Sequence, residues 1–525
     1  MELQFDECRV ELNWHIEQPL SHFFIGIGPN MTDTNIARLW IDGKWVESGT
    51  IGTSVNPSTG EVLGRFSDAG PGEAKSAIAA ARRAFDSTTW AHDRQLRARA
   101  LMQLADQLEA RSEVLIKTNA RETGKTIFGA SLEAHTAPGT LRHNAGLALS
   151  QRGGASEIAP GSIGVSTREP IGVAGLIIPW NAPLALCVRA LGPALAAGCT
   201  VVVKMPAQTA LTNALIADAI ASTETLPPGV VNLITESGSA GAMLLVDSPD
   251  VDAINFTGST KTGRLIASKA AETLKRVSLE LGGKTPLVVF EDTDIDAVAP
   301  VIVAAVTMFS GQFCMAGSRL LVQQSVADAW RKRIAAMLEG VVIGPADDPG
   351  SQMGPLIDKA SVQRVDRIVT DAARYGRILV RGGPVTEGPL AAGAFFRPAM
   401  VEPEGTDVPL VQQEIFGPVL SFETFADEAD AIARANATQY GLAASVFTRD
   451  ADRAQRVVRG IRAGTIWVNG WAVLSDSYEE GGFKQSGVGR ARGDASLEEF
   501  QETKTMIQMV APAAGVAAAR EAQHS

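Results

Sequence analysis

The chain has 525 residues, of which 45% are hydrophobic and 20% are charged, and its formal net charge at pH 7 is −11. A chain of this length predicts two or three domains with separate cores. The net negative charge, with no compensating basic stripe, argues against nucleic acid as a partner, and no apolar run is long enough to span a bilayer.

The cysteine and histidine content argues against disulfides and metal sites. The four cysteines (Cys8, Cys187, Cys199 and Cys314) are too few for a disulfide framework in so long a chain. Neither they nor the six histidines show the paired spacing of a structural zinc site. We therefore expect a protein of the reducing cytoplasm that binds no metal and does not enter a membrane.

Residues 1–30 differ in composition from the rest of the chain. They are aromatic-rich and lack the basic region and the small-residue cleavage site of a signal peptide. We expect them to be an N-terminal extension that is either an appended arm or the result of a misplaced start codon, with Met31 at or near the true first residue.

Helical and extended patterns then alternate along the chain. Residues 70–129 are helical in pattern, including residues 71–85 and 94–118, and residues 161–170 have the alternation of an extended segment. Continuous apolar strands joined by helices predict a parallel sheet covered on both faces. The strands are expected at residues 173–179, 200–204, 230–234, 253–256 and 277–281, with helices at 184–197, 210–223, 240–246 and 261–274.

A second α/β region comes next, and a strand-like tail comes after it. The α/β region begins with a strand at residues 287–290, a helix at 297–309 and a strand at 318–323, with further strands near Leu379, Val419, Ser445 and Ile466. The tail at residues 500–510 is expected to pair with residues 161–170. Such a ribbon has open edges, which are usually covered by another subunit.

Cys314 lies at the junction between the helix and the strand of this second region. A free cysteine is often a small core residue, so a nucleophile and a core filler are equally good interpretations of it alone. Glu280 ends an apolar strand before two glycines, where it is either an ion-paired terminus or a base. Asn181, between Trp180 and Ala182, is either a turn residue or a donor to an oxyanion.

Three other segments have the chemistry of a coenzyme site. Gly258 and Ser259 lie between a strand and a helix, where a phosphate can bind the helix N-terminus, although a helix cap explains them too. Lys204 ends a strand at the edge where parallel sheets bind ligands, but it is also consistent with a surface lysine. Glu414 and Phe416 lie in a Gly-Pro loop that a capped turn would also explain.

Five segments carry a resemblance to a known family. They are Phe256-Thr257-Gly258-Ser259, Leu279-Glu280-Leu281-Gly282-Gly283-Lys284, Gly311-Gln312-Phe313-Cys314, Glu414-Ile415-Phe416-Gly417-Pro418 and Gly482-Phe483-Lys484-Gln485-Ser486-Gly487. In this order and spacing the chain resembles the NAD(P)-dependent aldehyde dehydrogenase superfamily from about Leu39 to Val510.

The resemblance implies an α/β subunit of three parts that forms a homodimer or homotetramer. A Rossmann-like coenzyme domain is expected at residues 31–150 and 171–282, and an α/β catalytic domain at 283–495. A small β ribbon for oligomerisation, with the tail, is expected at residues 151–170 and 496–525.

The resemblance also implies the roles of the site residues in oxidation of an aldehyde to the acid. Cys314 stands at the position of the family's nucleophile, and Glu280 at that of its general base. Asn181, with the main-chain N–H of Cys314, resembles the family's oxyanion hole. The coenzyme, expected to be NAD, would be held by Lys204 and Ser259 at the ribose and pyrophosphate and by Glu414 and Phe416 at the nicotinamide ribose and ring, with Trp180, Gly258 and Ala207 nearby.

Three positions depart from the pattern of the family. Ala207 stands where a carboxylate often binds the adenosine ribose, so NADP is possible beside NAD. Ala190 and Ala491 stand where Lys and Glu are common, a pair thought to carry protons away from the base. Because the Lys and the Glu are both absent, neither leaves the other as an unpaired buried charge. Hydrolysis would then rely on Glu280 and ordered water.

The substrate funnel is expected to select a medium-sized apolar, aromatic or cationic aldehyde. The small Ala182 leaves room for a ring or a branched chain. Glu480 beside Trp471 would suit a betaine or amino aldehyde, whereas Arg189 would favour a carboxylated semialdehyde. The expected lining is Ala182, Leu186, Arg189, Phe313, Met315, Trp471, Leu474 and Glu480.

Two alternatives belong to other classes. A CoA-acylating semialdehyde dehydrogenase needs no base to activate water, and the presence of Glu280 argues against it. A non-catalytic relative retained for binding is disfavoured because Cys314, Glu280 and Asn181 are all present.

Overall fold

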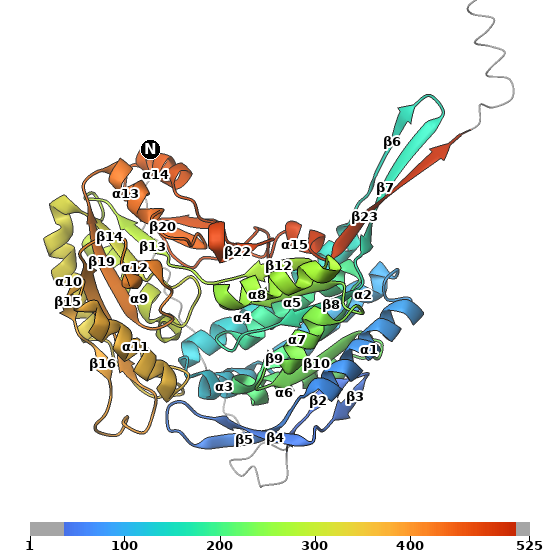
Figure 1. The fold of residues 1–525 in the computed structure, drawn as a ribbon, viewed down its shortest axis with the longest axis horizontal. Helices are drawn as coiled ribbons and strands as arrows, with labels where there is room; N and C mark the ends of the chain where they lie inside the picture. The colour runs from blue at the N-terminus through green and yellow to red at the C-terminus, as the bar shows by residue number, and fades with distance from the viewer. Residues whose placement is uncertain (1–35, 511–525) are drawn as a thin grey trace, which may run out of the picture. The chain divides into compact units, whose positions relative to one another are not determined.

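The computed structural model describes residues 36–510 and shows an α/β protein built on two large sheets (Figure 1). The expected extension at residues 1–30 lies outside the described residues. Within residues 36–510, no helix combines the length and apolar character needed to cross a bilayer.

The first large sheet has eight strands, and its five central strands are parallel, as the sequence predicts. The outer strands pair antiparallel. In spatial order the strands are β22 (Gly487–Val488), β12 (Arg276–Glu280), β11 (Ala253–Thr257), β8 (Val173–Ile177), β9 (Thr200–Pro206), β10 (Val231–Glu236), β2 (Leu39–Ile41) and β3 (Lys44–Val46).

Helices cover both faces of this sheet because successive strand side chains point to opposite sides. Val173 and Ile177 pack with one group of helices, whereas Ala174 and Leu176 pack with the other. The first group is α1 (Pro71–Ser87), α7 (Ala240–Asp247) and α8 (Thr260–Ala270), and the second is α2 (Arg94–Glu109), α4 (Ile127–Ser150), α5 (Pro183–Ala197) and α6 (Ala210–Ala221).

The helix expected at residues 94–118 is two helices, and this part of the prediction is wrong. α2 ends at Glu109, and α3 (Ser112–Thr123) begins after Arg111, whose backbone leaves the helical region at φ −105° and ψ 8°. The Arg111 guanidinium donates to Asp218 at 2.8 Å and to Ser222 at 2.8 Å, both at the end of α6. These long-range hydrogen bonds stabilise the break between α2 and α3, and the local sequence does not predict them.

The second large sheet has seven strands, all parallel to their neighbours except β15. In spatial order they are β15 (Gly376–Val380), β18 (Ala399–Pro403), β19 (Val419–Phe425), β14 (Arg319–Gln323), β13 (Pro286–Val289), β20 (Ala443–Phe447) and β21 (Thr465–Val468). One face packs on α9 (Ile295–Thr307) and α10 (Ala327–Glu339), and the other on α13 (Glu428–Ala435) and α14 (Ala451–Gly460). α11 (Lys359–Ala372) packs on β18 and β19.

The C-terminal part of the chain returns to the first sheet. β22 falls in the range expected for the catalytic domain, yet it pairs antiparallel with β12, with Gly487 opposite Glu280. The chain then continues into β23 (Gln501–Met509), which pairs antiparallel with β7 (Ser162–Pro170) over its whole length. The predicted pairing of the tail with residues 161–170 is thus confirmed, and β6 (Gly154–Ala159) completes this ribbon.

Smaller elements complete the described residues. They are the sheet of β1 (Ile36–Ala37), β5 (Val62–Asp68) and β4 (Thr50–Val55), the pair β16 (Gly383–Pro384) and β17 (Phe396–Arg397), the short helices α12 (Pro409–Gln412) and α15 (Ala495–Glu498), and the 3₁₀ turns η1 (Ala207–Thr209), η2 (Ala271–Thr273), η3 (Met308–Gly311), η4 (Gln324–Val326) and η5 (Lys484–Ser486).

Candidate active site

The candidate site lies at the carboxyl ends of three neighbouring parallel strands. β12 ends at Glu280, β11 ends at Thr257, and β8 leads into the segment that carries Asn181. Parallel strands end at the same edge of a sheet, which is where open α/β sheets bind ligands. The strand order therefore brings Glu280 and Asn181 to one edge of the first sheet.

A sharp turn after α9 brings Cys314 to this edge. The helix ends at Thr307, two residues before the predicted end, because Phe309, Ser310 and Gly311 adopt φ values of 51°, 57° and 72°. Gly311 is also required by packing, since a Cβ there would collide with the main chain of Gly417. The turn thus packs the Cys314 segment directly against the loop that carries Glu414.

The surroundings of Cys314 are apolar and aromatic. The half-buried cysteine packs with Phe313 and Trp471 beside a small core of Met315, Leu442, Ala443 and Trp467. The ring centroids of Phe313 and Trp471 are 6.0 Å apart, and the Trp471 indole N–H donates to the Met315 carbonyl at 3.0 Å. Burial raises the pKa of the Cys314 thiol to about 12, so the resting group is a thiol.

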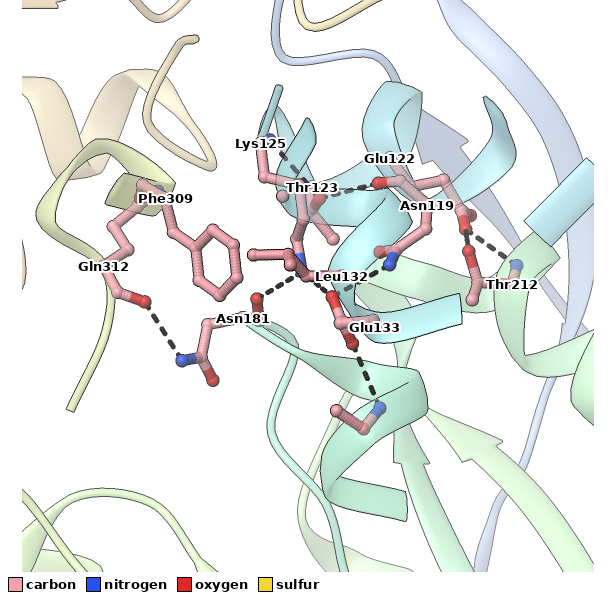
Figure 2. A network of polar contacts seen from close by, with 12 residues as sticks. Asn119, Glu122, Thr123, Lys125, Leu132, Glu133, Asn181, Thr212, Phe309 and Gln312 are labelled. Atoms are coloured by element: carbon pink, nitrogen blue, oxygen red, sulfur yellow. Dashed lines mark hydrogen bonds and ion pairs between the residues drawn. The ribbon is translucent and has the colours of Figure 1, made fainter. Parts of the chain in front are cut away.

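Asn181 is tied to the Cys314 segment by hydrogen bonds (Figure 2). Its side-chain Nδ2 donates to the main-chain carbonyl of Gln312 at 3.0 Å. Its main-chain carbonyl accepts from Lys125 Nζ at 2.7 Å. The amide therefore lies beside the loop that carries Cys314, where the predicted role as an oxyanion donor requires it.

Glu280 is the buried last residue of β12. Its neighbours across the sheet are Thr257 on one side and Gly487 on the other. Among the described residues, none donates a hydrogen bond to its Oε1. Burial raises the pKa of its carboxyl to about 8, with Arg189 lowering it and Glu480 raising it. A carboxyl with this pKa is mostly uncharged at neutral pH.

Arg189 and Glu480 pair with each other, which corrects their expected roles in the substrate funnel. The two side chains are only 6% and 5% exposed and form an ion pair. Glu480 also accepts from Arg492 Nε at 3.0 Å, and Arg189 donates to Thr257 Oγ1 at 3.0 Å. Neither charge is therefore free to select a cationic or a carboxylated aldehyde.

This ion pair lies next to the two positions that depart from the family pattern. Arg189 precedes Ala190, and Glu480 pairs through its main chain with Ala491, with both N···O distances at 2.7 Å. Although burial would raise it, Arg189 and Arg492 hold the pKa of Glu480 below its usual value. A charged pair is thus present near Glu280, with Arg189 next to Ala190 in the sequence and Glu480 opposite Ala491 across a β-bridge.

The residues expected to bind coenzyme line the same edge of the first sheet. Ser259 caps α8, accepting from the Thr262 N–H at 3.2 Å, and the Gly258 N–H donates to the Glu280 carbonyl at 3.0 Å. Lys204 is half-buried in β9, where burial lowers the pKa of its ammonium, and Ala207 begins η1 three residues later. A capped helix N-terminus suits the pyrophosphate of a dinucleotide.

The second half of the coenzyme site combines aromatic rings with a carboxylate. The rings of Trp180 and Phe416 meet edge-on with centroids 5.6 Å apart. Glu414 accepts from the Gly283 N–H at 3.4 Å, and burial raises the pKa of its carboxyl to about 7. A Cβ at Gly282 would collide with this carboxylate, so the glycine is what lets Glu414 reach the end of β12. This set of groups fits a ribose and a flat ring.

The remaining predicted funnel residues include both buried and exposed side chains. Ala182 and Met315 are buried and Leu186 is half-buried, whereas Leu474 is 38% exposed in the loop that follows Trp471. Of the predicted funnel residues, Phe313, Met315 and Trp471 belong to the same apolar cluster as Cys314.

Comparison with known proteins agrees with this geometry. The model of the aldehyde dehydrogenase family matches residues 45–506. A dehydrogenase of (Z)-2-((N-methylformamido)methylene)-5-hydroxybutyrolactone from Acinetobacter baylyi is 37% identical over 472 residues, 89% of this chain and 96% of that protein. Phenylacetaldehyde dehydrogenase from Pseudomonas fluorescens is 36% identical over 481 residues, 90% of this chain and 95% of that protein.

Solved structures agree as well. Betaine aldehyde dehydrogenase from Staphylococcus aureus, in complex with NAD+, superposes with a TM-score of 0.88 at 33% identity, covering 91% of this chain and 96% of the other. The chain belongs to the aldehyde dehydrogenase family. It is therefore an oxidoreductase that acts on aldehydes, and the predicted family and fold are confirmed.

Several residues at this aldehyde dehydrogenase site were not predicted from the sequence. Gln312 lies two residues before Cys314 within a segment that was itself recognised, so its position was a usable signal. Glu133 is an acidic residue in a helix rich in alanine and glycine, which is a weaker signal. Thr257 also lies within a recognised segment. Lys125 and Arg492 gave no signal, because no periodicity of the sequence relates them to their partners.

Proposed function

We propose that Cys314, Asn181 and Glu280 divide the oxidation of an aldehyde into two stages. The observation that supports this proposal is the convergence of a thiol, an amide and a carboxyl from separate elements at one sheet edge. Acyl transfer needs a nucleophile, a donor to the oxyanion and a base.

Cys314 rests as a thiol, so in the first stage it gives its proton to solvent, and the resulting thiolate attacks the aldehyde carbon and forms a thiohemiacetal. The amide of Asn181 and the main-chain N–H of Cys314 stabilise the negative charge that develops on the aldehyde oxygen. When that charge collapses back to a carbonyl, hydride leaves the carbon and a thioester remains on Cys314. Bound NAD+ supplies the acceptor for this hydride.

In the second stage Glu280 accepts a proton from water, and the resulting hydroxide attacks the thioester. The carboxylic acid leaves, and the sulfur of Cys314 is free for the next turnover. Only the carboxylate form of Glu280 can act in this way, so its raised pKa sets the pH at which the second stage begins.

Trapping the intermediate tests this assignment. The acyl-enzyme is quenched in acid during turnover with NAD+ and digested, and the modified peptide is identified by mass. We expect the acyl group on Cys314, with Cys187 and Cys199 unmodified, because those two thiols are fully buried. An acyl group on any other residue, or none while product forms, would overturn the assignment.

We propose an apolar or aromatic aldehyde of medium size as the substrate. Phe313, Trp471 and Met315 lie in the same apolar cluster as Cys314, and the buried Ala182 has a small side chain. Phenylacetaldehyde dehydrogenase is among the similar proteins. Since Arg189 and Glu480 neutralise each other, no charged group of the predicted funnel remains to favour an ionic substrate.

A substrate panel tests this choice. Phenylacetaldehyde, hexanal, betaine aldehyde and succinic semialdehyde are compared by kcat/KM under one condition. We expect the two uncharged aldehydes to exceed both ionic ones by at least tenfold. A preference for betaine aldehyde would mean that the aromatic rings of Trp471 and Phe313 select a cation.

We propose NAD as the preferred coenzyme, with measurable use of NADP. Ala207 offers no carboxylate to the ribose hydroxyls, which lowers NAD binding by about 1–2 kcal/mol, and Lys204 offers its ammonium to a 2′-phosphate. Ala207→Glu should raise the KM for NADP at least tenfold and leave kcat unchanged. Complete rejection of NADP by the unaltered protein would show that another residue sets the choice.

We also propose a homodimer or homotetramer of the reducing cytoplasm. The ribbon of β6, β7 and β23 exposes apolar side chains, among them Ile158, Ile507 and Met509 at 56%, 63% and 74%. Exposed apolar residues on an open sheet edge are typical of an interface. Cys187, Cys199 and Cys314 are free thiols, which fits a reducing compartment. Light scattering with and without residues 496–525 tests the assembly.

A further inference from the structure

A buried ion pair lies behind the oxyanion side of the active site. Lys125, between α3 and α4, pairs with Glu133 in the second turn of α4, and their side chains are 1% and 3% exposed. Burying two charges costs more free energy than their attraction returns unless further hydrogen bonds satisfy both groups. The partners of these further bonds show what the pair holds.

Both members of the pair bond to the segment around Asn181 (Figure 2). Lys125 Nζ donates to the Asn181 carbonyl at 2.7 Å. Glu133 Oε2 accepts from the Ala185 N–H at 3.1 Å in the first turn of α5, while Oε1 accepts from Asn119 Nδ2 at 2.9 Å. The pair thus fixes Asn181 itself and the helix turn that begins just after it.

The same ammonium contacts the turn that precedes Cys314. Lys125 Nζ lies 4.4 Å from the centroid of the Phe309 ring, in cation–π range. Packing confines this ring, since a Cβ at Gly129 would lie 2.6 Å from it. A lysine ammonium has three N–H donors, and Glu133, the Asn181 carbonyl and the Phe309 ring supply three acceptors.

We propose that Lys125, held by Glu133, is a positioning residue that fixes the Asn181 amide relative to Cys314 for stabilisation of the oxyanion. The proposal rests on the oxyanion role proposed above for Asn181. An oxyanion donor acts only when it lies within about 0.5 Å of its productive position. Lys125 connects the two segments whose separation sets that position, because it contacts the main chain of Asn181 and the side chain of Phe309.

A double-mutant cycle distinguishes this role from a purely structural one. The variants are Lys125→Met, Asn181→Ala and the two combined, and the measurement is the single-turnover rate of coenzyme reduction at saturating aldehyde and NAD+. Asn181→Ala should slow this step about 10²–10³-fold, as loss of one oxyanion donor does elsewhere. Lys125→Met should slow it at least tenfold alone but less than threefold in the Asn181→Ala background.

Matched variants provide the second arm. Glu133→Gln keeps the shape of the side chain but removes its charge, so it should slow coenzyme reduction in the same background-dependent way even if Lys125→Met fails to fold. Glu122→Gln is the control, because Glu122 is also a buried carboxylate that accepts from a helix start, at Leu211 and Thr212 of α6 with distances of 2.8 Å. It should change the single-turnover rate less than twofold.

The possible failures are distinct. Equal losses from Lys125→Met or Glu133→Gln in both backgrounds would overturn the positioning role and leave the function of Asn181 intact. An unchanged rate in Asn181→Ala would overturn the oxyanion role, and the proposal for Lys125 with it. A loss from Glu122→Gln as large as that from Glu133→Gln would show a general effect of buried carboxylates and would also overturn the proposal.

Discussion

The two sides of Cys314 are held in different ways. On the oxyanion side, Asn181 is held by hydrogen bonds through both its side-chain amide and its main-chain carbonyl. On the base side, the Oε1 atom of Glu280 receives no hydrogen bond from residues 36–510, and burial raises the pKa of the carboxyl to about 8. Asn181 is thus already held in place by the protein, whereas the Glu280 carboxyl stays uncharged until it loses its proton.

The buried charges near the two sides act differently as well. Lys125 donates a hydrogen bond directly to Asn181, the residue that we propose it positions. Arg189 bonds instead to Thr257, the sheet neighbour of Glu280, and influences Glu280 by charge. Asn181 is thus held by direct hydrogen bonds, whereas Glu280 is influenced by burial and by nearby charge.

Removing the thiol should abolish both stages. Cys314→Ala should lower aldehyde oxidation at least 10³-fold, because neither side can act without the nucleophile. Coenzyme reduction is measured in a single turnover, and coenzyme binding is measured by fluorescence. Binding should be retained, and Cys187→Ala and Cys199→Ala should keep nearly full activity. Substantial turnover in Cys314→Ala would contradict this.

Removing the base should separate the stages. Glu280→Gln should keep the burst of reduced coenzyme but slow steady-state turnover at least 10²-fold, because hydrolysis needs a carboxylate and hydride transfer does not. Stopped-flow absorbance measures both phases in one experiment. Loss of the burst itself would show that Glu280 acts before the thioester forms, which would remove the contrast between the two sides.

Breaking the pair near the base should destabilise the protein strongly. Arg189→Leu leaves the Glu480 carboxylate buried with one partner fewer, and such a loss costs about 3–5 kcal/mol. Arg189→Leu combined with Glu480→Leu should recover most of this loss, since no charge is then left unpaired. Urea unfolding at fixed protein concentration measures the difference. A double variant less stable than the single one would show that the pair is stabilising in its own right.

The smallest expected effect is on the pH dependence of hydrolysis. Glu280 acts as the carboxylate, so the rate of acyl-enzyme hydrolysis should rise with pH and reach half its plateau near pH 8. Arg189 lowers this pKa and Glu480 raises it, so the midpoint should move up in Arg189→Leu and down in Glu480→Gln. Shifts in the opposite directions, or a flat profile, would contradict the assigned influence of the pair.

Local patterns in the sequence predicted the elements that carry the site. Apolar runs such as residues 173–179 and 200–204 are strands because a parallel sheet covered on both faces excludes polar residues from its core. The tail strand, whose side chains are mostly exposed, was predicted from its strand-like pattern alone and pairs as expected. Cys314, Glu280 and Asn181 were identified from their segments, and the structure places the segments around one sheet edge.

Pairings between distant residues could not be predicted. Arg189 and Glu480 are 291 positions apart, so their charges were taken as free when they neutralise each other. The break at Arg111 depends on Asp218, which is 107 positions away. Lys125 and Glu133 are only eight positions apart, but a turn and a helix start lie between them, and neither periodicity relates them.

The strand that ends in Glu280 depends on the last part of the chain to be synthesised. β12 would be the edge of the first sheet without β22, whose Gly487 lies opposite Glu280. A ribosome makes the chain from its N-terminus, so β12 stays an unprotected edge until more than two hundred further residues have emerged. The strand that carries Glu280 therefore gains its second neighbour only after residues 487–488 have been made. A polypeptide released before Gly487 contains Cys314 and Glu280, yet it lacks the strand that pairs with β12.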